Sequence, residues 1–248
     1  MRQFSVTPKP SLSRGLFYAQ RRRLSLHAVT MSFAPYASPS FRTAAITTVC
    51  MVVATVGFIT YFGKQGSFIL INGYYNPALD AFFQYITFLG DGVVFVPVVL
   101  YCLLQNRSYL IAVVAGILIS TLLVQGMKHW VFPHDLRPFS LESGGVIIHK
   151  IEGVPLHRLH SFPSGHTATA FTVAMLLAAL MRQWWWGLVL PFVAMLVGYS
   201  RVYLGQHFVT DVCAGVTIGL FSAWLALVVC KQATKRWMQH MHTVTQKK

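Results

Sequence analysis

The chain has 248 residues, of which 55% are hydrophobic and 10% are charged. Because a soluble domain carries roughly 25% charged residues, this chain has too little polar surface for a water-soluble globule, and its composition indicates a single domain whose solvent is the bilayer. The formal charge of +14 comes with no nucleic-acid-binding motif and no interleaved aromatic and basic residues, which argues against a nucleic-acid partner.

The two ends of the chain are basic. Residues 1–43 hold seven Lys/Arg, no acidic residue and no apolar periodicity, which predicts a disordered basic N-terminal tail. The same composition is typical of an organelle transit peptide, and a translation start at Met31 is a third interpretation. Residues 231–248 hold five Lys/Arg and no acidic residue, so we expect a second basic tail there.

Six apolar runs lie between the tails, and we interpret each as a membrane-spanning helix. The first has nineteen residues, which as a helix cross roughly 30 Å of hydrocarbon. The runs are 44–62, 84–104, 109–127, 163–181, 184–199 and 207–230. A short interfacial helix is expected at 77–83, and the longest connection, 128–160, is rich in His, Pro and Gly. We therefore predict an all-α, six-transmembrane-helix bundle over residues 44–230.

The distribution of basic residues predicts the topology. An even number of spans puts both tails on one side; with the tails in the cytoplasm, fourteen Lys/Arg lie inside and six lie outside, as the positive-inside rule requires. Residues 184–186, three tryptophans, then lie at the cytoplasmic interface, where aromatic belts occur. We expect a protein of the cytoplasmic (inner) membrane with both termini cytoplasmic and the tails near anionic headgroups.

Some residues inside the apolar runs have structural interpretations. The four cysteines lack metal-ligand spacing, so we predict neither a disulfide nor a metal site. Asp91 is costly inside an apolar run and is a functional candidate by default. Because Gly90 and Gly92 flank it, we interpret it instead as marking a bend or the start of a span.

Polar residues gather where the predicted spans reach the outer face. Long basic side chains at span ends can simply extend to the interface, but this does not explain two histidines, an aspartate and a Pro-Ser-Gly turn on the same face. The candidate site residues are Lys128, Arg137, Ser164, Gly165, His166, Arg201, His207 and Asp211. His149, His157 and His160, in the long connection, are interpreted as solvated or as lying at the rim of the site.

Five of these residues are suited to holding a phosphate group. A phosphate dianion needs several cationic and N–H donors aimed at its oxygens. Lys128, Arg137 and Arg201 supply three cations, and an Arg can grip phosphate oxygens with two donors. Ser164 and Gly165 open the fourth span, where free backbone N–H groups face an anion and glycine permits close approach.

The remaining three residues are suited to catalysis. His207 and Asp211 are four residues apart and share one helical face. The carboxylate can accept the Nδ1–H of the imidazole and leave Nε2 free to attack phosphorus, forming a phosphohistidine. His166 is then the general acid for the leaving oxygen and the base for water. A metal-binding His-Asp pair is an alternative, but further ligands with suitable spacing are lacking.

At these residues the sequence resembles the type 2 phosphatidic acid phosphatase superfamily of integral membrane phosphatases. The family signature is Lys-x6-Arg-Pro, then Pro-Ser-Gly-His, then Ser-Arg-x5-His-x3-Asp. The second motif is present at 163–166 and the third is complete from Ser200 to Asp211. The first departs from the pattern, because eight residues separate Lys128 from Arg137-Pro138.

The resemblance covers residues 44–230 and implies a metal-independent lipid phosphate phosphatase without a cofactor. The family's membrane members act on phosphatidate, phosphatidylglycerophosphate, polyprenyl pyrophosphate or lipid A-type phosphates, so the expected partners are a lipid phosphate substrate and membrane lipids. We predict activity at the outer, periplasmic-type face. Two alternatives stay open: a phosphotransferase that passes the phosphate to a second lipid, and a non-enzymatic lipid-handling membrane protein.

Overall fold

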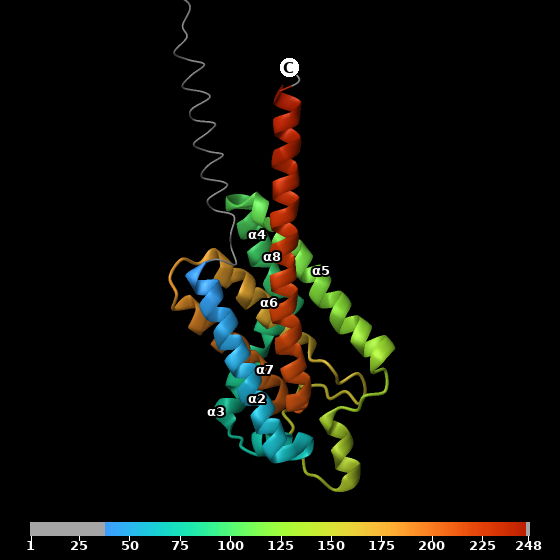
Figure 1. The fold of residues 1–248 in the computed structure, drawn as a ribbon. Helices are drawn as coiled ribbons and strands as arrows, with labels where there is room; N and C mark the ends of the chain where they lie inside the picture. The colour runs from blue at the N-terminus through green and yellow to red at the C-terminus, as the bar shows by residue number, and fades with distance from the viewer. Residues whose placement is uncertain (1–37, 247–248) are drawn as a thin grey trace, which may run out of the picture. The chain divides into compact units, whose positions relative to one another are not determined.

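The computed structural model describes residues 38–246, and every regular element in this range is a helix (Figure 1). The all-α prediction is therefore confirmed for the described residues. The principal helices are α2 (Pro39–Asn72), α3 (Pro77–Ile86), α4 (Phe95–Gln105), α5 (Leu110–Gly126), α6 (Gly165–Leu180), α7 (Trp186–Tyr203) and α8 (Val209–Gln246). The short ones are η2 (Thr87–Gly90), η3 (Gly92–Val94), η4 (Arg107–Tyr109), η5 (Met127–Val131) and η6 (Pro138–Gly144).

Helix α2 begins before the boundary that composition suggested. The side chain of Ser38 accepts a hydrogen bond from the Phe41 amide at 3.1 Å, and Pro39 occupies the first turn, which together form a strong helix start. Phe41 is buried, so residues 39–43 belong to the helix and not to the tail. The rest of the predicted N-terminal tail, residues 1–37, lies outside the described residues.

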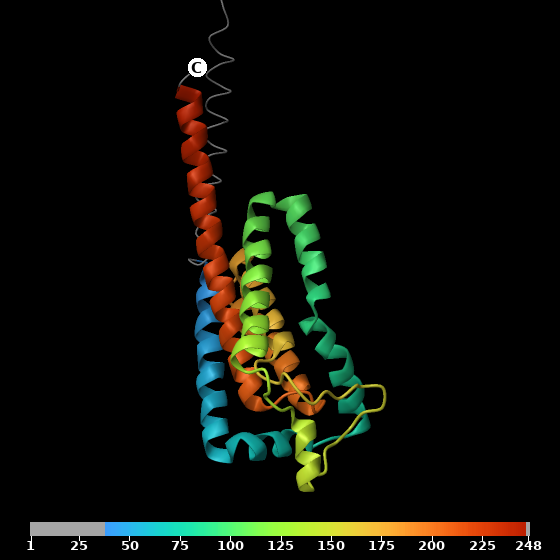
Figure 2. The same cartoon turned by 90° about the vertical axis from the view of Figure 1, so that its right-hand side faces the viewer.

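Two breaks shape the first half of the bundle. Gly63 (φ 71°, ψ 172°) interrupts α2, a backbone conformation that glycine adopts readily, and the following turns run across the end of the bundle (Figure 2). Further on, the helices Pro77–Gly90 and Gly92–Gln105 meet at an angle of 61°. The expected interruption at residues 90–92 is thus confirmed, and Asp91 stands alone at the break with an extended backbone.

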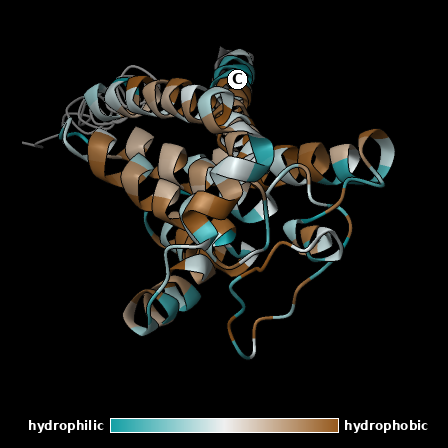
Figure 3. Cartoon of the chain, turned by 90° about the horizontal axis from the view of Figure 1, so that it is seen from below, coloured by the Kyte–Doolittle hydropathy of each residue, from teal (hydrophilic) through white to brown (hydrophobic). Residues whose placement is uncertain are grey.

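Within the described residues, four helices are long and apolar enough to cross a membrane, or five if the bent pair counts as one span. They are Pro39–Asn72, Arg107–Val131, Trp186–Tyr203 and Val209–His240. The apolar α6 is shorter, with 16 residues. Their hydrophobic stretches are visible in brown in Figure 3. The chain is an integral membrane protein.

Small residues let α8 pack closely on α6. A Cβ added to Gly215 would lie 2.7 Å from the Ser164 carbonyl oxygen, and one added to Gly219 would lie 2.5 Å from the Phe171 Cβ. Glycines at helix interfaces in membranes allow backbones to approach in this way. As a result the start of α8 meets the start of α6, and the Ser164 amide donates to the Asp211 carbonyl at 3.0 Å.

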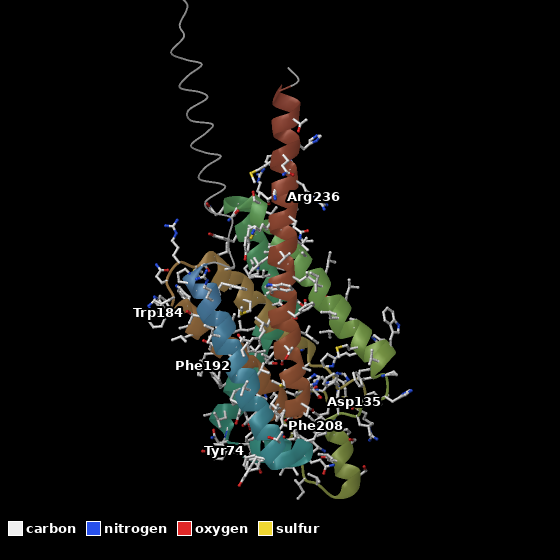
Figure 4. The ribbon with its side chains drawn as sticks, in the orientation of Figure 1. Tyr74, Asp135, Trp184, Phe192, Phe208 and Arg236 are labelled. Carbon is white, nitrogen blue, oxygen red and sulfur yellow. The ribbon has the colours of Figure 1, made fainter. Side chains whose placement is uncertain are left out.

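The two ends of the bundle carry different residues. Figure 4 shows Trp184 and Arg236 toward one end and Tyr74, Asp135 and Phe208 toward the other. Helix α8 continues beyond residue 230 as far as Gln246, although the sequence suggested a separate tail from 231. Residues 231–246 contain neither Gly nor Pro, so nothing in them stops the helix.

Candidate active site

The eight candidate residues come from η5, the long connection, the start of α6, the end of α7 and the start of α8 with the turn before it. Figure 4 labels Phe208, the neighbour of His207 in the chain, at one end of the bundle. The three cationic residues and His207 all lie within electrostatic range of the His166 imidazole. The convergence that the sequence predicted from span ends is therefore present in the fold.

His207 lies in the tight connection between α7 and α8. Gly205 has a positive φ of 68°, which turns the chain so that the amides of Gln206 and His207 both donate to the Arg201 carbonyl, at 2.9 and 3.1 Å. The imidazole is 2% exposed, and its Nδ1 lies 3.3 Å from Oδ2 of Asp211. Nε2, on the other side of the ring, points away from this carboxylate.

Asp211 is fully buried and held in place by further donors. Its Oδ2 accepts hydrogen bonds from the Ser161 hydroxyl at 2.5 Å and from the Phe208 amide at 2.9 Å. Donors on a carboxylate stabilise its ionised form. The carboxylate that faces His207 is thus charged and fixed in orientation.

Burial sets the protonation state of His207. It lowers the pKa of this imidazole to about 3, and the bond to Asp211, which favours the charged form, only partly offsets the effect. A pKa this far below neutrality leaves the ring uncharged at physiological pH. An uncharged imidazole is the form that can act as a nucleophile.

Arg137 is anchored by carbonyl oxygens. Its Nε donates to Leu159 at 2.9 Å, and its Nη1 donates to the backbone and side-chain oxygens of Gln206 at 3.1 and 3.2 Å. Burial lowers the pKa of Arg137, while nearby Asp211 raises it. The guanidinium therefore ties the long connection to the turn before α8 and is fixed beside His207.

Arg201 has an unused donor. Its Nη1 donates to the Thr87 hydroxyl at 2.8 Å, whereas its Nε is buried and has no hydrogen-bond partner among the described residues. A buried donor without a partner is costly. An anion bound beside α7 would satisfy it.

Lys128 lies in η5, a π-helical turn that follows α5. It is half-buried and within electrostatic range of Arg137, Arg201 and Asp211. The carbonyl of Lys128 is 3.2 Å from Nδ1 of His160. The π-helical turn, a wider turn often found at functional sites, begins the connection of eight residues between Lys128 and Arg137.

The start of α6 presents free donors. The Ser164 hydroxyl accepts from the amide and hydroxyl of Thr167 at 3.4 and 2.8 Å, so its own O–H remains available as a donor. The first amides of a helix lack internal partners. A Cβ on Gly165 would make only an ordinary contact, 3.6 Å from Val124, so the space that this glycine leaves is available to a ligand.

His166 borders two cavities and contacts Asp91. Its Nε2 lies 2.7 Å from Oδ1 of Asp91. A cavity of about 530 Å³ is lined by both residues together with Thr87, His157, Arg201 and others, and one of about 170 Å³ lies on the α5 side. His157 is thus at the rim, as expected, whereas His149 instead pairs with Asp80 at 2.9 Å.

Sequence reasoning missed several residues of the site. Ser161 and Thr87 were not assigned roles, although they bond to Asp211 and Arg201. Gln206 was missed as the partner of Arg137. Asp91 carried a signal, a carboxylate inside an apolar run, but was interpreted as structural only; its carboxylate contacts His166. No sequence pattern marked the other three.

The apolar helices, with cations and histidines gathered at one end, are the arrangement expected of an integral membrane enzyme that acts on phosphate groups. The PAP2 superfamily model matches residues 109–237. The chain belongs to the PAP2 superfamily, and it is a lipid phosphatase, as the resemblance implied.

Individual relatives agree with this family. The chain is 32% identical over 176 residues to the lipid A 4'-phosphatase of Bacteroides thetaiotaomicron, covering 68% of this chain and 77% of that protein. It is 29% identical over 163 residues to the undecaprenyl-diphosphatase of Sulfolobus acidocaldarius, covering 65% and 76%. The crystal structure of Aquifex aeolicus LpxE is similar, with a TM-score of 0.57, 31% identity and coverage of 66% and 94%.

Proposed function

We propose that the protein hydrolyses a lipid phosphate ester or pyrophosphate through a phosphohistidine on His207. The observation that carries this proposal is the buried pair of His207 and Asp211 beside a cluster of cations. The phosphoryl group would be held by Lys128, Arg137, Arg201, Ser164 and Gly165. The otherwise unsatisfied Nε of Arg201 supports an anion at this place.

The reaction has two steps. Nε2 of His207 attacks phosphorus while the bond from phosphorus to the lipid oxygen breaks, and His166 gives that oxygen a proton. His166 then takes a proton from water as the water oxygen attacks the phosphohistidine, which releases phosphate and restores His207. Asp211 stays ionised throughout and stabilises the positive charge that develops on His207.

We further propose six membrane passes with the site on the outer, periplasmic-type face of a cytoplasmic membrane. As an α-helix, the 16 residues of α6 are about 24 Å long, enough for a sixth pass across a slightly thinned bilayer. The excess of Lys/Arg in both tails and the position of Trp184 and Arg236 at the end away from the site support this orientation.

The cavity of about 530 Å³ beside His166 and Arg201 has the size of a site for a small molecule, and we propose that it receives the headgroup. Glu152, His157 and Gln206 give it polar walls. The relatives named above, which act on lipid A and on undecaprenyl diphosphate by their names, support a large anionic lipid as substrate.

The test is a panel of lipid phosphates and pyrophosphates assayed with the wild-type protein and His207→Ala in detergent, with EDTA present. We expect release of inorganic phosphate by the wild type alone. A phosphorylated second lipid in place of free phosphate would indicate a phosphotransferase. Unchanged activity of His207→Ala, or full loss in EDTA that magnesium or zinc restores, would overturn the proposed mechanism.

A further inference from the structure

Asp91 occupies the break between η2 and η3, where its backbone is pressed against the first turn of α6. A Cβ added to Gly90 would lie 2.8 Å from the His166 Cβ and 2.7 Å from Cγ1 of Val197. Only glycine at position 90 allows this approach. The close approach brings Oδ1 of Asp91 to 2.7 Å from Nε2 of His166.

The Asp91 carboxylate lies between two apolar helices, where an ionisable side chain needs a partner. The Asp91 side chain is not needed to form the break between the two helices. Backbone hydrogen bonds form it, from the Asp91 amide to the Phe88 carbonyl and from the Val94 amide to the Asp91 carbonyl. An ionisable group within an apolar helix pair is costly unless it is paired. The pairing that the described residues offer at hydrogen-bond distance is with His166, and Arg201 lies within electrostatic range.

The side chains around His166 are mostly cationic. The groups that face it from the neighbouring elements are Lys128 on η5, Arg137 on the long connection, Arg201 on α7, His207 before α8 and Asp91 at the break. Like charges destabilise an imidazolium, whereas an adjacent carboxylate stabilises it. A general acid at this position therefore needs a carboxylate beside it.

We propose that Asp91 is a positioning residue for His166 and does for the acid–base histidine what Asp211 does for the nucleophile. This inference rests on the proposed function. Asp91 holds the proton on Nε2, so that Nδ1 is the atom that exchanges protons with the substrate. In the first step the Nδ1 proton passes to the lipid oxygen as its bond to phosphorus breaks. In the second, Nδ1 accepts a proton from the attacking water, and the imidazolium that results is stabilised by the Asp91 carboxylate.

The test compares two substrates that differ in their leaving group, because a positioning role for Asp91 predicts different losses on them and a purely structural role predicts equal losses. The leaving oxygen of a lipid alkyl phosphate has to be protonated as its bond to phosphorus breaks. A nitrophenyl phosphate that carries the same acyl chain releases a stable phenolate, so its leaving oxygen needs no proton. Asp91→Asn keeps the size and one acceptor but removes the charge. We expect kcat/KM, which reports the step that releases the leaving group, to fall about 10- to 100-fold for the alkyl substrate and less than about threefold for the nitrophenyl substrate. The loss stays at or below the lower end of general-acid catalysis because Asp91 acts through His166.

The pH profile provides a second readout. Without the Asp91 charge the imidazolium loses its proton more readily, so the falling limb of kcat/KM for the alkyl substrate shifts to lower pH by about one unit or more. Asp91→Glu, which keeps the charge, restores at least part of both effects. Equal losses on the two substrates with an unmoved falling limb, or unchanged activity of Asp91→Asn, would overturn the inference.

Two control variants show whether a failed prediction concerns Asp91 alone or the acid–base role of His166. In His166→Ala, kcat/KM must show the same dependence on the leaving group, and adding Asp91→Asn to it must cause no further loss. If His166→Ala lacks that dependence, the acid–base role of His166 fails and this inference falls with it; if only Asp91→Asn lacks it, this inference alone fails. The proposed hydrolysis through His207 fails separately, if His207→Ala keeps its activity. Glu142→Gln, which removes a carboxylate paired with Lys150 at 2.8 Å on the connection, should behave as wild type.

Discussion

The molecule contains two His–Asp pairs in one site, and they differ in construction. His207 and Asp211 lie four residues apart, are 2% and 0% exposed, and meet at 3.3 Å. His166 and Asp91 come from separate elements, are 32% and 37% exposed, and meet at 2.7 Å beside two cavities. The first pair is fixed in the protein interior, and the second faces the space where a ligand would enter.

This difference follows from what each histidine has to do. A nucleophile must be uncharged and fixed, and burial gives His207 both properties by lowering its pKa to about 3. An acid–base group must exchange protons with a lipid oxygen and with water, so it has to be reached by both. The difference in burial therefore matches the proposed division of labour.

The largest effect is expected at the buried pair. Asp211→Asn removes the charge that supports His207 during attack and should lower kcat about 10³- to 10⁴-fold, as for carboxylates that back a catalytic histidine in other hydrolases. The loss should exceed that of Asp91→Asn on the same substrate. Phosphate release at saturating lipid measures it, and a loss below tenfold would break the comparison.

A smaller effect is expected at the cation that links the two pairs. Arg201→Ala removes the buried Nε donor, and loss of one transition-state donor costs about 10²- to 10³-fold in kcat. Arg201→Lys should recover little, because an ammonium lacks the guanidinium fork. Arg158→Ala, whose guanidinium lies over the Phe139 ring at 5.2 Å, is the matched control and should keep nearly full activity.

The hydrogen bond from Ser161 tests how much the fixed orientation of Asp211 contributes to activity. Ser161→Ala removes one of the donors to Oδ2 of Asp211 and leaves the Phe208 amide in place. A hydrogen bond to a charged group contributes about 1.5 kcal/mol, so kcat should fall about tenfold. Ser143→Ala, which loses only an exposed local bond to Ser140, should not change it. Equal activity of the two variants would contradict the positioning role of Ser161.

The smallest effect concerns stability against pH. Because folding lowers the pKa of His207 from 6.5 to about 3, the unfolded state binds more protons between these values, and stability is lost as the pH falls from 6.5 toward 3. The loss from this one group is at most about 1.4 kcal/mol per pH unit. Thermal unfolding in detergent should therefore be less pH-dependent for His207→Asn than for wild type. His129→Asn, at an exposed position, should follow wild type; parallel curves for all three proteins would contradict the shift.

The sequence predicts those features that depend on neighbouring residues. Apolar runs predicted the helices, and the spacing of His207 and Asp211 predicted that the two side chains meet. The shared helical face was wrong, because His207 precedes α8 (Val209–Gln246); the pair meets across the turn in which the Phe208 amide donates to Oδ2 of Asp211. Residues 163–166 predicted the start of α6 for the same local reason. These predictions depend on the chain within a few turns, so tertiary packing did not alter them.

Features that depend on distant contacts could not be predicted in this way. The contact between Asp91 and His166 requires the 61° bend and the close approach at Gly90, and the bond from Arg201 to Thr87 requires the same arrangement. The glycines at 90 and 92 signalled the bend but not its partner. The extension of α8 past residue 230 was missed because basic composition was read as a tail, although the segment has no helix breaker.

The central claim is that His207 carries the phosphoryl group, and labelling tests it most directly. The protein is mixed with lipid phosphate labelled at phosphorus, denatured in base within one turnover, and digested for mass spectrometry. We expect a base-stable, acid-labile phosphate on His207 in the wild type, increased in His166→Ala when a nitrophenyl lipid phosphate is used because the second step then lacks its base. A label on another residue, or phosphate release at the wild-type rate by His207→Ala, would contradict the account.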